Sequence, residues 1–172
     1  MLDHLIVDGY NVINAWPELI AIKDQDLQHA RDSLVDILAG YGSFKALKVV
    51  VVFDAHLASG RDSVEVIGPA LEVVYTNEGE TADSYIEKMV YSLVRQGERV
   101  YVVTSDWAEQ IAVLSFGAYR ISAREFRLDV QAANKALRDG FTETALTCRR
   151  HELEGRLDQE IREKLDKIRR GG

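Results

Sequence analysis

The run Lys48-Val-Val-Val-Val-Phe53 constrains the fold more than any other feature of this sequence. Its β-branched and aromatic residues favour a strand. A strand with one face in water alternates apolar and polar residues, whereas an uninterrupted apolar run suits a central strand of a parallel sheet that is covered on both faces. Because layers of helices provide that cover, the run predicts an α/β protein.

Strand-like runs and helical patterns alternate along the rest of the chain. Further strands are predicted at residues 2–7, 64–67, 71–75 and 99–103. Apolar residues that recur every three to four positions predict helices at residues 26–38, 81–96 and 107–116. Strands alternating with helices favour a three-layer α/β/α sandwich with a mostly parallel central sheet.

Local signals add boundaries to these elements. Gly40 and Gly42 are expected to end the first helix. Ser122 and Glu125 have capping-box spacing ahead of a helix that reaches about residue 137. Residues 8–11, between the first strand and the first helix, are expected to form a loop.

The length of 172 residues suits one compact domain at residues 1–140 and a charged C-terminal helical extension at residues 141–172. Residues 149–172 hold eight Lys/Arg and six Asp/Glu around a narrow apolar stripe. Their basic side chains are suited to RNA phosphates, but the interleaved acids are equally typical of an exposed helix with salt bridges.

Composition excludes several classes of protein. A net charge of −7 argues against a high-affinity, sequence-reading DNA binder. The longest apolar runs are too short to cross a bilayer, and the N-terminus has no signal-peptide pattern, so a cytoplasmic protein without a membrane partner is expected. Cys148 is the only cysteine, which excludes an internal disulfide and a thiolate-rich zinc site.

Acidic residues follow the predicted strands at the points where these end. Asp8 ends the first strand, Asp54 follows the second, and Asp106 lies just past the strand at residues 99–103. Glu80 and Asp83 lie where the loop after residues 71–75 enters a helix. The carboxyl ends of parallel strands share one edge, where α/β proteins bind their ligands. Four separate stretches of chain are therefore predicted to place acids at one edge.

A carboxylate cluster of this kind is unfavourable unless protons or cations neutralise it. Two unit charges 4 Å apart repel by about 4 kcal/mol at an effective dielectric constant near 20. Oxygen ligands favour Mg²⁺ or Mn²⁺ over softer metals. Such metals can clamp the attacking and leaving oxygens of a phosphodiester, and this is the chemistry that the pattern predicts.

Each of these residues also has a structural interpretation when it is taken alone. Asp8 and Asp54 could be turn or loop residues, and Asn11 could be a cap. An acid such as Asp83 is favoured in a first helical turn by the helix dipole, and Asp106 could cap the helix that follows it. The functional interpretation depends on their joint occurrence at one edge.

Four sequence motifs together resemble the NYN domain, specifically its YacP-like branch within the PIN-like nucleases. They are Asp8-Gly-Tyr-Asn-Val-Ile-Asn14, Phe53-Asp-Ala-His56, Glu80-Thr-Ala-Asp-Ser-Tyr-Ile-Glu87 and Val103-Thr-Ser-Asp106. The resemblance implies a PIN-like fold, a divalent metal site and endonucleolytic cleavage of RNA. For the YacP-like branch it further implies cleavage of messenger RNA in association with translating ribosomes.

The resemblance also implies roles for individual residues. Asp8 and Asp83 are expected to be the central ligands of Mg²⁺ or Mn²⁺, and Asp54, Glu80 and Asp106 to complete the metal cluster. Asp8, Asp83 and Asp106 are the expected catalytic residues. They would hold the metal that activates a water for in-line attack, leaving 5′-phosphate and 3′-hydroxyl ends.

Three further residues are expected to assist the substrate. Asn11 and Ser105 are expected to be supporting polar groups of the site. Arg61, in the loop at residues 57–63, is a candidate contact to the RNA backbone, although a solvated loop is the alternative there.

Three other functions fit the sequence less well. A response-regulator receiver would have an adjacent acidic pair after the first strand, but Gly9 and Tyr10 follow Asp8. A haloacid-dehalogenase-like phosphatase would have an aspartate where Tyr10 stands. A non-catalytic RNA- or ribosome-binding module with a relic site stays open, although low net basicity makes it a weak binder.

Overall fold

The computed structural model describes residues 3–54 and 64–140 of the chain. By its contacts the chain divides into two compact units, Met1–Gln131 and Ala132–Gly172. The first unit holds the strands and helices considered below, and in the second unit residues 132–140 are helical. Arg61, Cys148 and the predicted C-terminal helix lie outside the described residues.

A six-stranded sheet forms the centre of the first unit, with the order β3-β4-β2-β1-β5-β6. Five strands are parallel, and β3 pairs with β4 in the antiparallel direction at one edge. The strands are β1 (Asp3–Asp8), β2 (Lys48–Phe53), β3 (Val64–Ile67), β4 (Leu71–Tyr75), β5 (Arg99–Val103) and β6 (Tyr119–Ile121). The predicted α/β class and mostly parallel sheet are therefore confirmed.

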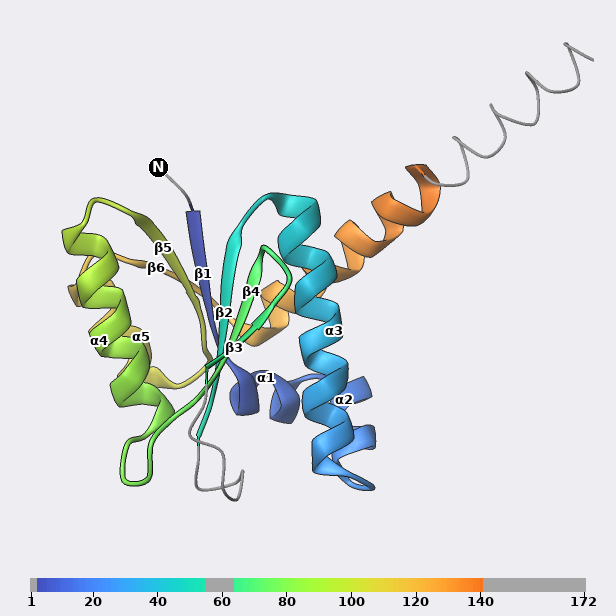
Figure 1. Ribbon diagram of the computed structural model, residues 1–172. Coiled ribbons are helices and arrows are strands. Elements are labelled where there is room, and N and C mark those ends of the chain that lie inside the picture. Colours follow the sequence, from blue (N-terminus) through green and yellow to red (C-terminus); the bar gives the residue numbers. More distant parts are fainter. Residues whose placement is uncertain (1–2, 55–63, 141–172) are drawn as a thin grey trace, which may run out of the picture. The chain divides into compact units, whose positions relative to one another are not determined.

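Helices cover both faces of this sheet (Figure 1). In the first unit they are α1 (Gly9–Ala15), α2 (Pro17–Lys23), α3 (Leu27–Lys45), α4 (Ala82–Arg95), α5 (Trp107–Ser115) and the start of one more helix at residues 123–131. In Figure 1 the pair α4 and α5 lies on one side of the sheet and α1, α2 and α3 lie on the other. This arrangement is the predicted three-layer sandwich.

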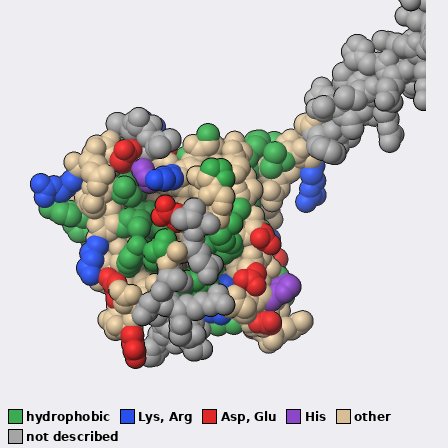
Figure 2. Space-filling view, in the orientation of Figure 1, with side chains coloured by type: hydrophobic (Ala, Val, Ile, Leu, Met, Phe, Trp, Pro, Cys, Tyr) green, Lys and Arg blue, Asp and Glu red, His purple; other side chains and the backbone are tan. Residues whose placement is uncertain are grey.

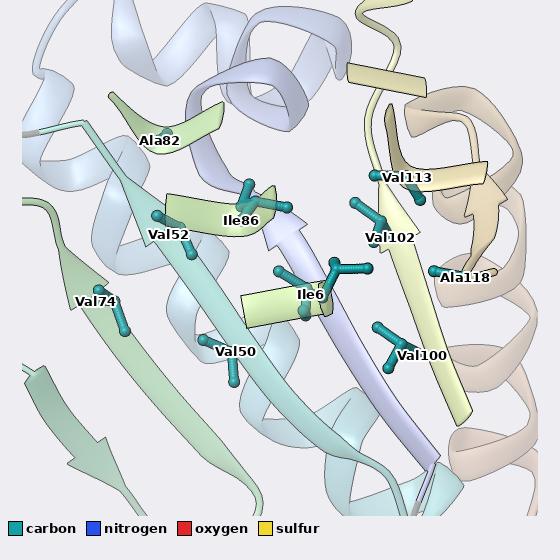
Figure 3. Close-up of a cluster of buried hydrophobic side chains, with 11 residues drawn as sticks. Ile6, Val50, Val52, Val74, Ala82, Ile86, Val100, Val102, Val113 and Ala118 are labelled. Carbon is teal, nitrogen blue, oxygen red and sulfur yellow. The ribbon is translucent and has the colours of Figure 1, made fainter. Parts of the chain in front are cut away.

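The core between the sheet and α4 consists of short branched side chains (Figure 3). Ile6, Val50 and Val102 of three adjacent strands pack with Ile86 and Val90 of α4, and all five are at most 4% exposed. On the outer surface hydrophobic side chains also gather between α4 and β3 (Figure 2). No helix among the described residues is long and apolar enough to span a membrane.

The prediction of a loop at residues 8–11 is wrong, because α1 begins at Gly9, directly after β1. The carboxylate of Asp8 caps this helix by accepting the backbone N–H of Asn11 at 3.3 Å. Gly9 lies so close to Phe53 that a Cβ would come within 2.3 Å of Cε1 of that ring. Val12 and Ile13 are completely buried, so tertiary packing stabilises a helix too short to show a clear period.

The predicted end of α3 at Gly40 and Gly42 is also wrong, since the helix continues to Lys45. Tyr41 is 6% exposed, and its hydroxyl donates a hydrogen bond to Asp129. A Cβ on Gly42 would lie 2.8 Å from Cγ2 of Val49, so this glycine allows the helix to approach β2 closely. The helix ends instead at Ala46, which adopts the left-handed conformation with φ of 54°.

Candidate metal centre

The register of the parallel strands brings their carboxyl ends to a common edge. Asp8 is the last residue of β1 and lies opposite Val52 of β2. Asp54 follows Val52 by two residues, so it lies near the same edge. On the other side of β1, Val7 lies opposite Val103, the last residue of β5. The chain then reaches Asp106, the N-cap of α5, within three residues.

Helix α4 adds a further acid at this edge. Thr81 caps the helix by accepting the backbone N–H of Ser84 at 3.2 Å, and Asp83 lies in the first turn. Ala82 and Ile86 pack into the core beneath the helix, which fixes the helix against the sheet. Asp83 is therefore held at the sheet edge although its own side chain is exposed.

A cleft of about 460 Å³ opens at this edge. It brings together four of the predicted acids, Asp8, Asp54, Asp83 and Asp106. Its other lining residues are Tyr10, Asn11, Asn14, Thr81 and Ala82. The electrostatic basis of the predicted metal site, several carboxylates facing one space, is thus present in the structure.

One acid beside the cleft was not predicted from the sequence: Glu109 of α5, which is 1% exposed. Glu109, Asp8 and Asp83 each offer a carboxylate oxygen, and these three oxygens lie within 4.8 Å of one another. The hydroxyl of Thr104 donates to Oε2 of Glu109 at 2.6 Å. The other oxygen, Oε1, is buried and has no hydrogen-bond donor among the described residues.

Protonation equilibria reflect this crowding. The pKa of Asp8 is raised to about 6, chiefly by burial and also by the nearby carboxylates of Asp83, Asp106 and Asp54, against the hydrogen bond from Asn11, which lowers it. Burial likewise raises the pKa of Glu109 to about 8, with contributions from Asp8, Asp83 and Asp106. Without a cation, the cluster therefore holds protons that isolated carboxylates would have released.

The pKa of Asp83 is raised as well, chiefly because its neighbours still partly desolvate its exposed carboxylate and then because of the charge of Asp106. Its hydrogen-bonding interaction with Glu109 acts in the opposite direction. The carboxylate oxygens of Asp83 and Glu109 lie within 4.8 Å of each other, and a cation between them would relieve the repulsion of their charges.

Glu80 is not brought into the cleft. Its carboxylate accepts a hydrogen bond from Nζ of Lys88 at 2.8 Å and faces a separate hollow lined by residues 77–81, Ser84 and Lys88. An internal cation therefore already neutralises Glu80, and the geometry does not favour it as a metal ligand.

The two predicted polar groups stabilise the backbone beside the acids. The side-chain oxygen of Asn11, which lines the cleft, accepts the backbone N–H of Ser105 at 3.0 Å. The hydroxyl of Ser105 accepts the N–H of Ala123 at 3.3 Å and does not line the cleft. Together they attach α1 and the start of the helix at residues 123–140 to the turn that carries Asp106.

Tyr10 forms a wall of the cleft and is held from behind. Its hydroxyl accepts a hydrogen bond from Nη1 of the buried Arg31 at 2.8 Å. Its ring lies edge-on to Phe53, with the ring centroids 5.2 Å apart. These two contacts fix the position of the tyrosine ring at the cleft.

Comparisons with known proteins agree with this architecture. The model of the YacP-like NYN domain family matches residues 5–170. A Bacillus subtilis (strain 168) protein, named as uncharacterized protein YacP, is 37% identical over 170 residues, which are 99% of this chain and 98% of the relative. These matches include the segments that supply every acid of the cleft.

Two crystal structures from Bacillus subtilis are similar in fold. Rae1 (YacP) aligns with a TM-score of 0.74 and 37% identity, covering 99% of this chain and 96% of the other. A point mutant of Rae1 (YacP) aligns with a TM-score of 0.69 and 39% identity, covering 80% of each chain. With the family model matching almost the whole length, this chain belongs to the YacP-like NYN domain family.

Proposed function

We propose that this protein is a divalent-metal-dependent endoribonuclease that cleaves messenger RNA. The observation that carries the proposal is the unsatisfied, buried Oε1 of Glu109 beside the carboxylates of Asp8 and Asp83. A buried acid without a donor is costly, and an oxygen-binding cation at this point would satisfy it. The NYN family, whose domains are nuclease-like, supports the same chemistry.

The residues present fit Mg²⁺ or Mn²⁺. Asp8, Asp83 and Glu109 supply hard carboxylate oxygens, which these ions prefer, and the described part of the site offers no thiolate or imidazole for a softer metal. When bound, the metal would draw negative charge from phosphate oxygens and lower the pKa of the attacking water. Glu80 is not included in this ligand set, because it is paired with Lys88.

The side chains around the cluster organise the reaction. Thr104 orients Glu109 through its 2.6 Å hydrogen bond, as donors behind a metal site commonly orient the ligands. Asp106 uses Oδ1 to accept the N–H of Glu109 at 3.1 Å, so its carboxylate is held at the cleft. Asp54 adds a further negative charge that attracts cations.

The bond changes follow from attack by water. The water oxygen bonds to phosphorus, the bond from phosphorus to the 3′-oxygen breaks, and that oxygen takes up a proton. The products are a 5′-phosphate and a 3′-hydroxyl. Lys23, whose Nζ donates to Asn14 at the cleft lining (2.8 Å), is placed to attract the phosphate backbone.

The test is cleavage of RNA by the purified protein with Mg²⁺ or Mn²⁺, both as free RNA and as a message on translating ribosomes. We expect Asp8→Asn and Asp83→Asn to abolish cleavage while the circular-dichroism spectrum is retained. Asp36→Asn, an exposed acid of α3, is the matched control and should cut normally. Binding of RNA or ribosomes without cutting under any of these conditions would instead identify a non-catalytic module.

A further inference from the structure

Trp107 is the most exposed large hydrophobic side chain among the described residues, at 75%. Tryptophan is usually well buried, because its large apolar surface is unfavourable in water. No hydrogen bond or ring contact of its indole is found within the described part of the chain. Such a side chain on a rigid element commonly marks a binding surface.

The position of Trp107 relative to the acidic cleft is fixed. It follows Asp106 directly and begins α5, the helix that carries Glu109. The preceding turn is held by three hydrogen bonds: Ser105 N–H to Asn11, Asp106 N–H to the Thr104 hydroxyl, and Ala123 N–H to the Ser105 hydroxyl. Trp107 thus follows a residue that lines the cleft, on a backbone that these hydrogen bonds hold in place.

We propose that Trp107 is a stacking platform for an unpaired base of the RNA, next to the phosphate that enters the cleft. This inference rests on the proposed function and adds to it a substrate class, single-stranded rather than paired RNA. Proteins that bind unpaired RNA stack splayed bases on exposed aromatic rings, and a base held within a duplex cannot reach such a ring.

A nearby cation supports an RNA strand on this side. Arg124 is exposed and follows Ala123, which is hydrogen-bonded to the Ser105 turn. None of the ion pairs between described residues includes it. An aromatic ring and an available guanidinium flanking one turn are the combination that single-strand binding sites use for base and backbone.

The competing occupant is a protein surface. Ile111 and Leu114, one and two turns along α5, are 50% and 58% exposed and continue an apolar stripe from Trp107. RNA is favoured because the most exposed of the three side chains, Trp107, is the one that directly follows Asp106 of the cleft. A protein partner would contact all three side chains, so substitutions at Ile111 and Leu114 distinguish a protein partner from RNA.

The chain offers a direct spectroscopic test, because it has only two tryptophans. Trp16 is 1% exposed, and its indole N–H donates to the carbonyl of Ala123 at 2.8 Å, so RNA should leave its emission unchanged. In an Asp83→Asn background, which prevents cleavage, a short unpaired RNA of mixed sequence with Mg²⁺ should quench the emission of Trp107. The same RNA annealed to its complement should not, and Trp107→Phe should abolish the signal.

The affinity of Trp107 variants for unpaired RNA provides a second test. Trp107→Ala should weaken binding of the unpaired RNA about 5- to 150-fold, the range expected for losing one stacked base. Trp107→Phe should retain most of the affinity because it keeps an aromatic face. In the cutting protein Trp107→Ala should raise KM more than it lowers kcat, and Ile111→Ser and Leu114→Ser should change neither.

The outcomes separate this inference from the proposed function. Cleavage with unchanged affinity in Trp107→Ala and no quenching would overturn the stacking role and leave the nuclease intact. Quenching and weakened binding without cutting by the parent protein would support the stacking role and reject the nuclease. Equal loss of ribosome binding in the Trp107, Ile111 and Leu114 variants, with RNA affinity unchanged, would assign the stripe to a protein partner and overturn the inference.

Discussion

Two glutamates near the acidic edge of the sheet, Glu80 and Glu109, have their negative charge balanced in different ways. Glu80, which lies just before α4, is partly exposed, and its carboxylate is paired with Nζ of Lys88 in α4 at 2.8 Å. On α5, Glu109 is buried, has a hydroxyl on one oxygen and no donor on the other among the described residues, and faces Asp8 and Asp83. The first glutamate is balanced within the protein, whereas the second requires a proton or a cation from outside.

The largest difference between the two glutamates should appear in activity. We expect Glu109→Gln to lower RNA cleavage at saturating Mg²⁺ by about 1000-fold or more, because it removes a metal ligand and not merely a group that orients one. Glu80→Gln should leave the rate within about twofold. Initial rates on one RNA measure both, and equal losses in the two variants would erase the distinction.

The stability of the metal-free protein should depend on pH through Glu109. Its pKa is about 8 in the folded state and 4.5 in the ordinary state, so folding binds a proton. The associated stability is complete below about pH 4.5 and is lost as the pH rises to about 8. Glu109→Gln lacks this loss and should be more stable than the parent by about 2–4 kcal/mol at about pH 9.

Urea unfolding with a chelator at about pH 5 and about pH 9 provides the measurement. Asp8, whose pKa is also raised, is present in both proteins, and its charge contributes to the raised pKa of Glu109, so the difference reports Glu109 together with its coupling to Asp8. Free energies of unfolding that differ by the same amount at both pH values would show that Glu109 does not titrate as described.

A smaller effect is expected from the hydroxyl that orients Glu109. Thr104 is completely buried, and Thr104→Val preserves its shape while removing both the donor to Oε2 of Glu109 and the acceptor of the Asp106 N–H. We expect the affinity for Mn²⁺ to fall about 10- to 100-fold, as for other residues that hold metal ligands in place. Isothermal titration measures this affinity, and Asp26→Ala, which removes the cap of α3 outside the cleft lining, serves as the comparison and should bind Mn²⁺ normally.

The smallest effect concerns the ion pair outside the cleft. Lys88 is 72% exposed in that pair, so Lys88→Ala should lower the free energy of unfolding by no more than about 1 kcal/mol. Metal affinity should stay the same. A clear gain in metal affinity on removing Lys88 would show instead that Glu80 turns into the cleft when it is released.

The sequence was sufficient to predict those residues of the site whose position depends only on the direction of the strands. Asp8, Asp54 and Asp106 follow parallel strands, and such strands end at one edge whatever their side-chain details. The capping box of Ser122 and Glu125 also forms as predicted, with reciprocal hydrogen bonds of 3.0 and 3.1 Å. These features are local or follow from topology.

The features that were missed depend on how elements pack. Glu109 is buried beside Asp8 and Asp83 on the same inward side of α5 as Gln110 and Val113, and the rotation of a nine-residue helix is not specified by its own apolar pattern. Its spacing of three from Asp106 was the available signal. Glu80 was expected in the cleft because the sequence shows that an acid is near but not which way its side chain turns.

Diffraction from crystals soaked in Mn²⁺, recorded at the manganese absorption edge, tests the central claim most directly. We predict an anomalous peak between Asp8, Asp83 and Glu109, with ion-to-oxygen distances of about 2.1 Å. The peak should be lost in Glu109→Gln crystals and kept in Glu80→Gln crystals. A saturating soak that leaves these three carboxylates without a peak, or that places the ion on Glu80, would contradict the account.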